Sequence, residues 1–472
     1  MTRHMSLESV EVGALQLDRF ADVLDDERFA AMQEAAARGR EAFAGRTIWN
    51  VNSTARGGGV AEMLVSLLAY ARGAGIDARW SVIAGDAGFF HVTKRLHNRL
   101  HGSEGDRGPL GDAERETYER ALEPNAAALR EQIGADDLVI LHDPQTAGLI
   151  PAIKAAGVPV VWRCHIGVDV PNDTARGAWR FLEPYVREAD AVVFSREAFA
   201  WEGLHGVPLH VIAPSIDAFA PKNQDLGAEA VDGILAAAGV VDGGGRGEFT
   251  RVDGSRGRIE HRADMTPLAA GARYVLQVSR WDRLKDPLGV IAGFAEHVAP
   301  RCPDLHLVYA GPAVEAVSDD PEGAEVLAEA RTCVGELDGD VRARVHLAAL
   351  PMDDLQENAA IVNALQRRAA VVVQKSIAEG FGLTVAEAMW KGRPVVASRI
   401  GGIQEQIVDG ESGRLLDDPR DLETFGALVA ELIDDPDGAE RMGAAARARV
   451  RDEFLAVRHL EQYLELLAPL AV

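Results

Sequence analysis

Two series of short β-rich runs, each alternating with helical periodicity, constrain the fold of this chain more than any other feature of its sequence. The first series comprises residues 47–51, 78–82, 138–142, 158–164, 191–195 and 209–213, and the second comprises residues 272–279, 305–311, 344–350, 369–374 and 393–398. This alternation is typical of parallel sheets with crossover helices. The sequence therefore predicts an α/β protein with two Rossmann-like, doubly wound domains rather than one repeated solenoid.

The two series divide the chain into five predicted parts. Residues 222–268 contain many glycines and charges of both signs, which makes a packed core improbable there. Apolar residues at helical spacing precede the first series and follow the second. The predicted parts are an N-terminal helical extension (1–45), an N-terminal Rossmann-like domain (46–220), a linker with a glycine-rich insertion (221–270), a C-terminal Rossmann-like domain (271–455) and a C-terminal helix that returns to the N-terminal domain (456–472).

Charge and cysteine content exclude several classes of partner. The formal net charge of −24 argues against nucleic acid or an anionic membrane, because both require a positive field. No apolar run approaches the roughly 18 residues of a membrane helix, and the first residues lack the apolar stretch of a secretory signal. Three scattered cysteines suit a reducing compartment. We therefore expect a cytoplasmic protein with neither a nucleic-acid nor a membrane partner.

A glycine-rich loop follows the first predicted strand. Gly57, Gly58 and Gly59 directly precede a helix, where free N–H groups and a partial positive charge favour a phosphate. The spacing differs from GxGxxG, and no Walker lysine follows. The loop is therefore a candidate phosphate contact, with an ordinary tight turn as the alternative.

Two basic residues follow the first strand of the second series. Arg280 and Lys285 come after residues 272–279, at the carboxyl end where ligands of open α/β sheets bind. Arg280 can grip a phosphate through two nitrogens, and Lys285 adds a second positive charge. The alternative is a pair of solvated surface cations.

A second loop carries two carboxylates and two glycines. Gly380, Phe381, Gly382 and Leu383 open a helix whose exposed N–H groups suit an anion, and Glu379 precedes them. Glu387 lies about one turn into that helix, where a carboxylate can accept hydrogen bonds from the hydroxyl pair of a ribose. A capped amphipathic helix would explain the apolar residues of this segment but not the acid.

The spacing of Glu379 and Glu387, about a hundred residues after Arg280 and Lys285, resembles the retaining GT-B glycosyltransferases of family 4. The resemblance spans residues 46–455. More narrowly, VNSTARGGGVAEML, HDPQTAGLI and WRCHIGVD are similar to segments of the trehalose glycosyltransferring synthases, and the neighbouring retaining trehalose phosphorylases share much of this pattern.

The resemblance implies a GT-B fold with an interdomain cleft and a role for each motif. Arg280 and Lys285 would hold the diphosphate, Glu387 the ribose, and Glu379 with the 380–383 backbone the donor sugar, so that Arg280, Lys285 and Glu379 are the catalytic candidates. The loop of Gly57, Gly58 and Gly59 would close over the donor. The implied reaction moves glucose from ADP- or UDP-glucose to free glucose and forms trehalose.

Two histidines and one further segment are candidates for sugar binding. His142 and His165 follow the ends of neighbouring predicted strands and so point toward the same crevice. A neutral imidazole there can hydrogen-bond sugar hydroxyls, although a satisfied core histidine is the alternative. Residues 86–98 carry Lys94 and His97 together with aromatic residues, a mixture that suits an acceptor sugar. The alternative for this segment is an amphipathic helix that covers the sheet.

No metal or cofactor is predicted. The one Asp-x-Asp motif, Asp338-Gly339-Asp340, precedes a predicted strand instead of following one and is interpreted as a turn. The partners expected are small molecules, a nucleotide-glucose and a hexose. The family pattern requires neither the insertion near 240–258 nor the long N-terminal segment, and both are candidates for a homodimer contact, for stability or for acceptor choice. Two other functions stay open: a retaining trehalose phosphorylase and a non-catalytic sugar-nucleotide binding protein. Glu387 favours the transferase, since a phosphorylase has no ribose to hold.

Overall fold

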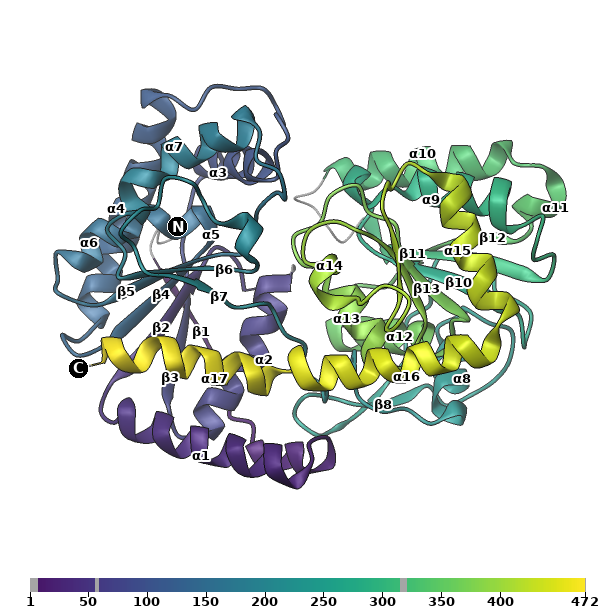
Figure 1. Ribbon diagram of the computed structural model, residues 1–472, viewed down its shortest axis with the longest axis horizontal. Coiled ribbons are helices and arrows are strands. Elements are labelled where there is room, and N and C mark those ends of the chain that lie inside the picture. The colour runs from purple at the N-terminus through teal and green to yellow at the C-terminus, as the bar shows by residue number, and fades with distance from the viewer. Residues whose placement is uncertain (1–6, 56–58, 315–320, 472) are drawn as a thin grey trace. The chain divides into compact units, whose positions relative to one another are not determined.

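A computed structural model describes residues 7–55, 59–314 and 321–471 (Figure 1). The chain divides into two compact units: unit 1 comprises residues 1–215 and 456–472, and unit 2 comprises residues 216–455. No helix in the described ranges combines the length and the apolar character needed to cross a membrane.

Unit 1 is built on a seven-stranded sheet in the order β1-β3-β2-β4-β5-β6-β7. All neighbouring strands pair in parallel except β1, which runs antiparallel to β3 at the sheet edge. Long apolar side chains on both faces explain why the central strands are fully buried. The strands are β1 (Glu8–Val10), β2 (Thr47–Asn52), β3 (Asp77–Val82), β4 (Leu138–His142), β5 (Val160–Cys164), β6 (Ala191–Phe194) and β7 (Leu209–Val211).

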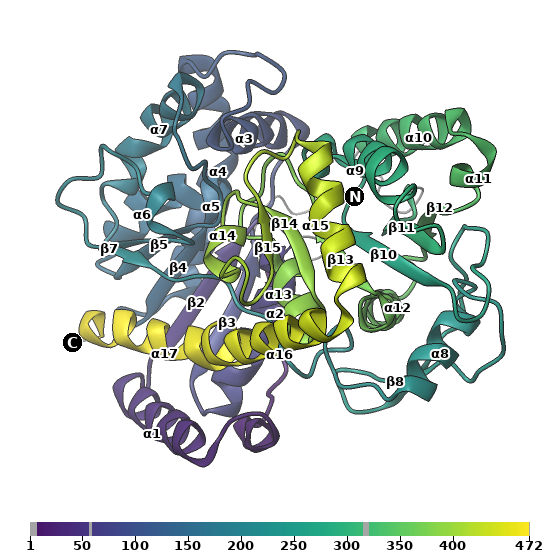
Figure 2. The ribbon, with the colours of Figure 1, turned by 45° about the vertical axis from the view of Figure 1, so that its right-hand side comes forward.

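Helices cover both faces of this sheet. On one face α3 (Ala87–Leu100), α4 (Asp112–Gln132) and α7 (Asp173–Val186) pack against a core that includes Trp49 and Trp162. On the other face lie α1 (Asp26–Ala42), α2 (Gly59–Gly73) and the C-terminal helix α17 (Ala456–Leu467), which contacts both α1 and α2 (Figure 2). Two short helices, α5 (Asp143–Thr146) and α6 (Ile150–Lys154), follow β4.

Unit 2 is built on a six-stranded parallel sheet in the order β12-β11-β10-β13-β14-β15. Helices α9, α10 and α15 pack on one face, and α12 and α13 lie on the other (Figure 1). The strands are β10 (Arg273–Val278), β11 (Leu305–Pro312), β12 (Val345–Leu350), β13 (Val371–Gln374), β14 (Val395–Ser398) and β15 (Arg414–Leu416). The helices are α8 (Ala228–Ala237), α9 (Pro287–Gly293), α10 (Pro321–Glu336), α11 (Gly339–Arg342), α12 (Leu355–Arg368), α13 (Leu383–Trp390), α14 (Ile403–Gln406), α15 (Leu422–Asp434) and α16 (Pro436–Glu453).

Each predicted strand run overlaps one of these strands, so the prediction of two doubly wound α/β domains is confirmed. Two regions differ from expectation. The first 45 residues were predicted to be helical, but they also supply β1, whose three residues are too short to show a period. Within 221–270 a packed core was called improbable, yet α8 buries Val231, Ile234 and Leu235, because the glycines and charges are concentrated after residue 241. That later stretch contains the hairpin of β8 (Glu248–Thr250) and β9 (Arg256–Arg258).

Candidate functional site

In unit 2 the sheet order reverses at β10, which pairs with β11 on one side and β13 on the other. At such a switch point the loops leaving the carboxyl ends of neighbouring strands diverge and leave room for a ligand. Arg280 and Lys285 follow β10, and Glu379 follows β13. The fold therefore places three of the predicted residues on the two loops that border the switch point.

Lys285 and Glu379 form an ion pair. The Nζ atom of Lys285 lies 2.7 Å from Oε2 of Glu379, and their side chains are 16% and 13% exposed. The other carboxylate oxygen of Glu379 accepts a hydrogen bond of 3.2 Å from the Gly380 N–H. The family resemblance implies that these two residues bind different parts of one substrate, and the structure shows that they also contact each other.

Arg280 lies outside this pair. Its guanidinium contacts the Asp282 carboxylate at 3.1 Å, and its side chain is 56% exposed. The Asp282 side chain is 15% exposed, and an ion pair with one solvent-exposed partner contributes little to stability. Arg280 is therefore available to exchange its carboxylate partner for another anion.

The loop of residues 380–383, between β13 and α13, has the backbone that an anion-binding turn requires. Gly382 has a φ of +82°, and a Cβ there would lie 2.9 Å from Ile403, so glycine is needed at this position. Helix α13 begins at Leu383, directly after this turn. The Phe381 side chain is buried against Phe454, and its carbonyl accepts a hydrogen bond from Gln406. Side chains behind the loop thus fix the main chain of residues 380–383.

Glu387 is a buried acid with one unsatisfied oxygen. The residue belongs to α13 and is 3% exposed. Its Oε1 atom lies 3.6 Å from Nζ of Lys222, but within the described ranges no group donates to Oε2. Leaving a buried acceptor without a donor costs about 1–3 kcal/mol. This oxygen is therefore suited to accept a hydrogen bond from a ligand hydroxyl.

Lys222 and Asn223, from the segment expected to be a linker, lie near Glu387. Besides Lys222, the Asn223 side chain accepts a 3.0 Å hydrogen bond from Lys391, whose ammonium also donates to the Glu387 carbonyl. Burial lowers the pKa of Lys391 well below its ordinary value, although the Glu387 carboxylate opposes that shift. Sequence reasoning missed these residues because the segment was interpreted as a linker.

In unit 1 the sheet order reverses at β2, which pairs with β3 and with β4. His142 ends β4 and His165 follows β5, and the structure brings them together as predicted. Nδ1 of His142 lies 3.2 Å from Nε2 of His165, and the rings stack at an angle of 14°. Nε2 of His142 lies 3.1 Å from Oδ1 of Asn50. Both nitrogens of His142 are thus engaged within the protein.

A fully buried arginine organises this pair. Arg163 donates to the His165 ring at 3.1 Å, to the Tyr463 hydroxyl at 3.1 Å and to the Ile212 carbonyl at 2.9 Å. Burial lowers the pKa of His142 to about 3 and that of His165 well below its ordinary value, and the Arg163 charge adds to both shifts. Both imidazoles are therefore neutral near pH 7, so each ring has one nitrogen that donates and one that accepts a hydrogen bond.

Asp143, directly after His142, is a candidate that sequence reasoning missed. It has a left-handed backbone with a φ of +64°, and its carboxylate accepts a 2.8 Å hydrogen bond from the His165 N–H. Burial raises its pKa to about 7, against the opposing effects of that hydrogen bond and of Arg163. Strained conformations and shifted pKa values cluster at functional sites. The sequence signal that could have identified Asp143 is an acid placed between the end of a strand and a proline.

The remaining predicted residues are less closely grouped. Gly57 and Gly58 lie outside the described residues, and Gly59 begins α2. Lys94 lies on the exposed side of α3, and the His97 ring packs 5.0 Å from that of His101. The buried side of α3 covers the sheet, so this segment is the amphipathic helix that was weighed as an alternative. Acceptor binding by Lys94 and His97 stays a prediction.

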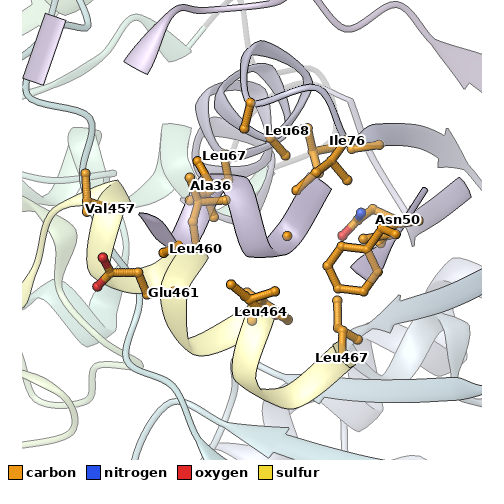
Figure 3. Close-up of a pocket in the computed structure, with 18 of the residues that line it drawn as sticks. Ala36, Asn50, Leu67, Leu68, Ile76, Val457, Leu460, Glu461, Leu464 and Leu467 are labelled. Atoms are coloured by element: carbon orange, nitrogen blue, oxygen red, sulfur yellow. The ribbon is translucent and has the colours of Figure 1, made fainter. Parts of the chain in front are cut away.

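An apolar cavity of about 100 Å³ lies on the other side of the unit 1 sheet from α3, between α1, α2, α17 and the sheet (Figure 3). Apolar side chains of α1, α2, α17 and the sheet line most of it, and Asn50, His142 and Tyr463 are among its polar members. Sugars need several hydrogen-bonding groups, which these walls do not supply. We therefore do not assign this cavity to a substrate.

Comparisons with known proteins give a consistent picture. Residues 50–201 match the model described as trehalose synthase, N-terminal domain, and residues 354–449 match glycosyl transferases group 1. The chain is 35% identical over 455 residues to a trehalose synthase of Pyrococcus horikoshii, with 96% of each chain covered. It is 27% identical over 453 residues to a trehalose phosphorylase of Pleurotus sajor-caju, which covers 88% of this chain and 56% of the phosphorylase.

A solved structure also resembles this chain throughout. A UDP-forming alpha,alpha-trehalose-phosphate synthase from Burkholderia xenovorans, in complex with glucose-6-phosphate, matches with a TM-score of 0.67 and 15% identity. The match covers 90% of this chain and all of that one. At this identity the likeness concerns the fold, which is the GT-B fold of glycosyltransferases.

Proposed function

Because this chain belongs to the trehalose synthase family of glycosyltransferases, we propose that it moves glucose from a nucleotide-glucose, ADP- or UDP-glucose, to free glucose. The product is trehalose, formed with retention at the donor carbon and without a divalent metal. Hexosyl transfer related to trehalose follows from the family itself. The donor, the acceptor and the stereochemistry are the proposal.

The observation that carries this proposal is the unsatisfied carboxylate oxygen of Glu387. It is buried in α13, close to the anion-binding turn at Gly382, and it has no donor among the described residues. A ribose hydroxyl would satisfy it, and the adjacent diphosphate would then face the N–H groups at the start of α13. A nucleotide meets both requirements at once, whereas inorganic phosphate meets only the second.

The charged residues of unit 2 would act on the leaving group. In the reaction the acceptor hydroxyl oxygen bonds to C1 of the donor glucose while the bond from C1 to the β-phosphate oxygen breaks. Negative charge then grows on the diphosphate, and fixed cations stabilise it more than they stabilise the ground state. Lys285 and Arg280 supply this charge, and Glu379 with the 380–383 backbone holds the sugar.

The proton of the acceptor hydroxyl goes to an oxygen of the departing diphosphate, on the same face as the attack. Retention by two glycosidase-type carboxylates would need a pair about 5 Å apart, and the sequence offers no such pair. Burial keeps His142 neutral, and both of its ring nitrogens already contact Asn50 and His165, so it would not accept the proton. It would orient a sugar hydroxyl only where that hydroxyl replaces one of these two partners. The products are trehalose and a nucleoside diphosphate, so atoms and charge balance.

A retaining trehalose phosphorylase is the second candidate, favoured by the similarity to the Pleurotus enzyme. The two functions predict different substrates. The protein should be incubated with ADP-glucose or UDP-glucose and free glucose, with and without EDTA, and the products identified by NMR. We expect α,α-trehalose and the nucleoside diphosphate, with no loss in EDTA. Activity with trehalose and phosphate but with neither sugar nucleotide would select the phosphorylase. Nucleotide binding without any acceptor-dependent turnover would indicate a binding protein.

A further inference from the structure

Directly after β13, unit 2 contains a buried lysine to which neither the sequence motifs nor the proposed reaction assigns a role. Lys375 is 1% exposed, and its ammonium forms an ion pair with the carboxylate of Asp286. Lysines are almost never fully buried unless they are paired, because the charge must be taken out of water. Lys375 therefore depends on Asp286, and Asp286 is the residue that follows Lys285.

The ion pair is closely packed against the first turn of α9. Asp286 has a left-handed backbone with a φ of +50° and caps α9 by accepting a hydrogen bond from the Gly289 N–H at 3.1 Å. A Cβ on Gly289 would lie 2.1 Å from the Asp286 carboxylate and 2.6 Å from the Lys375 ammonium. Real Cβ atoms do not approach other atoms this closely. Glycine at position 289 is thus required for the pair to form where it does.

Main-chain hydrogen bonds connect the same two loops. The carbonyl of Leu284 accepts a 2.7 Å hydrogen bond from the Ile377 N–H. The Gln277 side chain accepts from the Lys375 N–H at 3.0 Å and donates to the Lys285 carbonyl at 2.8 Å. The loop that carries Lys285 and the loop that carries Glu379 are therefore fixed to each other by hydrogen bonds other than their ion pair.

We infer that Lys375 is a positioning residue, which keeps the Asp286 carboxylate occupied so that the neighbouring Lys285 pairs with Glu379 and reaches the diphosphate. The physical basis is competition between charges. Without Lys375, the partly buried Asp286 carboxylate would attract the Lys285 ammonium away from Glu379. Without Asp286, the Lys375 ammonium would seek the Glu379 carboxylate. The inference rests on the proposed role of Lys285 in binding the donor.

A double-mutant cycle tests this competition. Lys375→Met should lower kcat by about 10-fold to 100-fold, the order expected when a catalytic group is displaced by about 1 Å. Asp286→Asn, which preserves the cap, should also lower kcat. The double variant Lys375→Met/Asp286→Asn should be more active than Lys375→Met alone, because no unpaired charge remains. Gly289→Ala, which removes no polar group, should lower kcat in the same direction.

A second capping aspartate in unit 2 supplies the matched control. Asp354 caps α12 and pairs with Arg251 at 2.5 Å, yet neither residue belongs to the proposed site. Arg251→Met and Asp354→Asn should lower the melting temperature without lowering kcat. Should Lys375→Met behave as this control does, or should the double variant be no more active than Lys375→Met, the inference is wrong. If the unaltered protein transfers no glucose from any sugar nucleotide, the proposed function fails instead.

Discussion

The two units meet the same structural problem, polar groups buried at the carboxyl ends of parallel strands, with different chemistry. In unit 1 the buried imidazoles are neutral: His142 and His165 contact each other, and burial lowers the pKa of both, with the charge of the buried Arg163 adding to the shift. In unit 2 they are charged and paired, as in Lys285 with Glu379. Neutral donors and acceptors suit sugar hydroxyls, whereas exchangeable ion pairs suit a diphosphate.

This difference predicts different responses to substitution in the two units. Charges in unit 2 should control the rate of the chemical step, because the leaving group gains charge there. The hydrogen-bonded groups of unit 1 should control stability against acid and affinity for the acceptor. The predictions below run from the largest expected effect to the smallest.

The largest effect is expected for Lys285→Ala. Loss of a preorganised group that stabilises developing charge typically lowers kcat by about 10² to 10³. We expect kcat and kcat/KM to fall together in steady-state assays, with folding checked by circular dichroism. Arg283→Ala is the matched control, since Arg283 lies in the same turn but pairs with Glu329 on the surface. A near-normal kcat for Lys285→Ala would remove the residue from the reaction.

Arg280→Ala should lower kcat by about 10², provided that Arg280 exchanges Asp282 for the diphosphate. Arg280→Lys should recover only part of this loss, because an ammonium lacks the planar fork that matches two phosphate oxygens. A surface cation would change stability by a few tenths of a kcal/mol and leave the rate unchanged. Equal kcat in the Ala variant and the unaltered protein would favour that simpler interpretation.

Acid should destabilise unit 1. A third buried histidine, His459 of α17, lies with its Nδ1 atom 2.8 Å from the Ser215 hydroxyl. Burial lowers the folded-state pKa values of His142, His165 and His459, so the unfolded chain binds more protons than the folded chain once pH falls below about 6.5. Stability from these residues is therefore present above that pH and is lost as pH falls. Asp143, whose pKa is raised to about 7, has the opposite effect between about pH 4 and 7, because there the folded chain binds the proton that the unfolded chain has lost. It contributes one proton, whereas the three histidines together contribute as many as three.

Denaturant unfolding followed between pH 7 and 4 measures this slope. His459→Gln should make it shallower by as much as one proton, since one histidine no longer contributes. Asp143→Asn should make the net slope steeper, because the opposing group is removed. A slope that neither substitution changes would contradict the description of unit 1 as a neutral buried network.

The smallest effect is expected at the predicted acceptor segment. Lys94→Ala or His97→Ala should raise the KM for glucose a few-fold and leave the KM for the nucleotide-glucose unchanged, since a single exposed hydrogen bond contributes about 0.5–1.5 kcal/mol. Initial rates with each substrate varied in turn separate the two constants. Unchanged acceptor kinetics in both variants would leave α3 with the structural role that its buried face already shows.

Much of the fold could be predicted because the apolar runs are long and regular. Except for β1 and β15, the strands of the two large sheets overlap the runs identified in the sequence, and the loops after β10 and β13 carry the expected residues. The edge strands β1 and β15, of three residues each, are too short to show a period and were missed. The apolar residues of α8 were overlooked because the glycines that follow them dominated the composition of the segment.

The candidate site was predictable only where a residue's chemistry shows in the sequence. Glu387 and Lys285 were found because an acid within a helix and a base after a strand suggest a ligand. Lys375 and Asp143 were not, since their importance depends on burial and on backbone strain, which only the folded chain shows. Lys222 became relevant because tertiary structure brings residue 222 beside residue 387.

Binding of a nucleoside diphosphate tests the central claim, that Glu387 in unit 2 holds the ribose of the donor. Calorimetry should compare ADP with 2′,3′-dideoxy-ADP, or the corresponding uridine pair if UDP-glucose is the donor, on the unaltered protein and on Glu387→Leu. We predict that the unaltered protein binds the hydroxyl-bearing nucleotide about 10-fold or more tightly than the dideoxy form, as expected for hydrogen bonds to a charged acceptor. Glu387→Leu should bind both forms alike. Equal affinity for the two nucleotides in the unaltered protein, or the same preference in Glu387→Leu, would contradict the account.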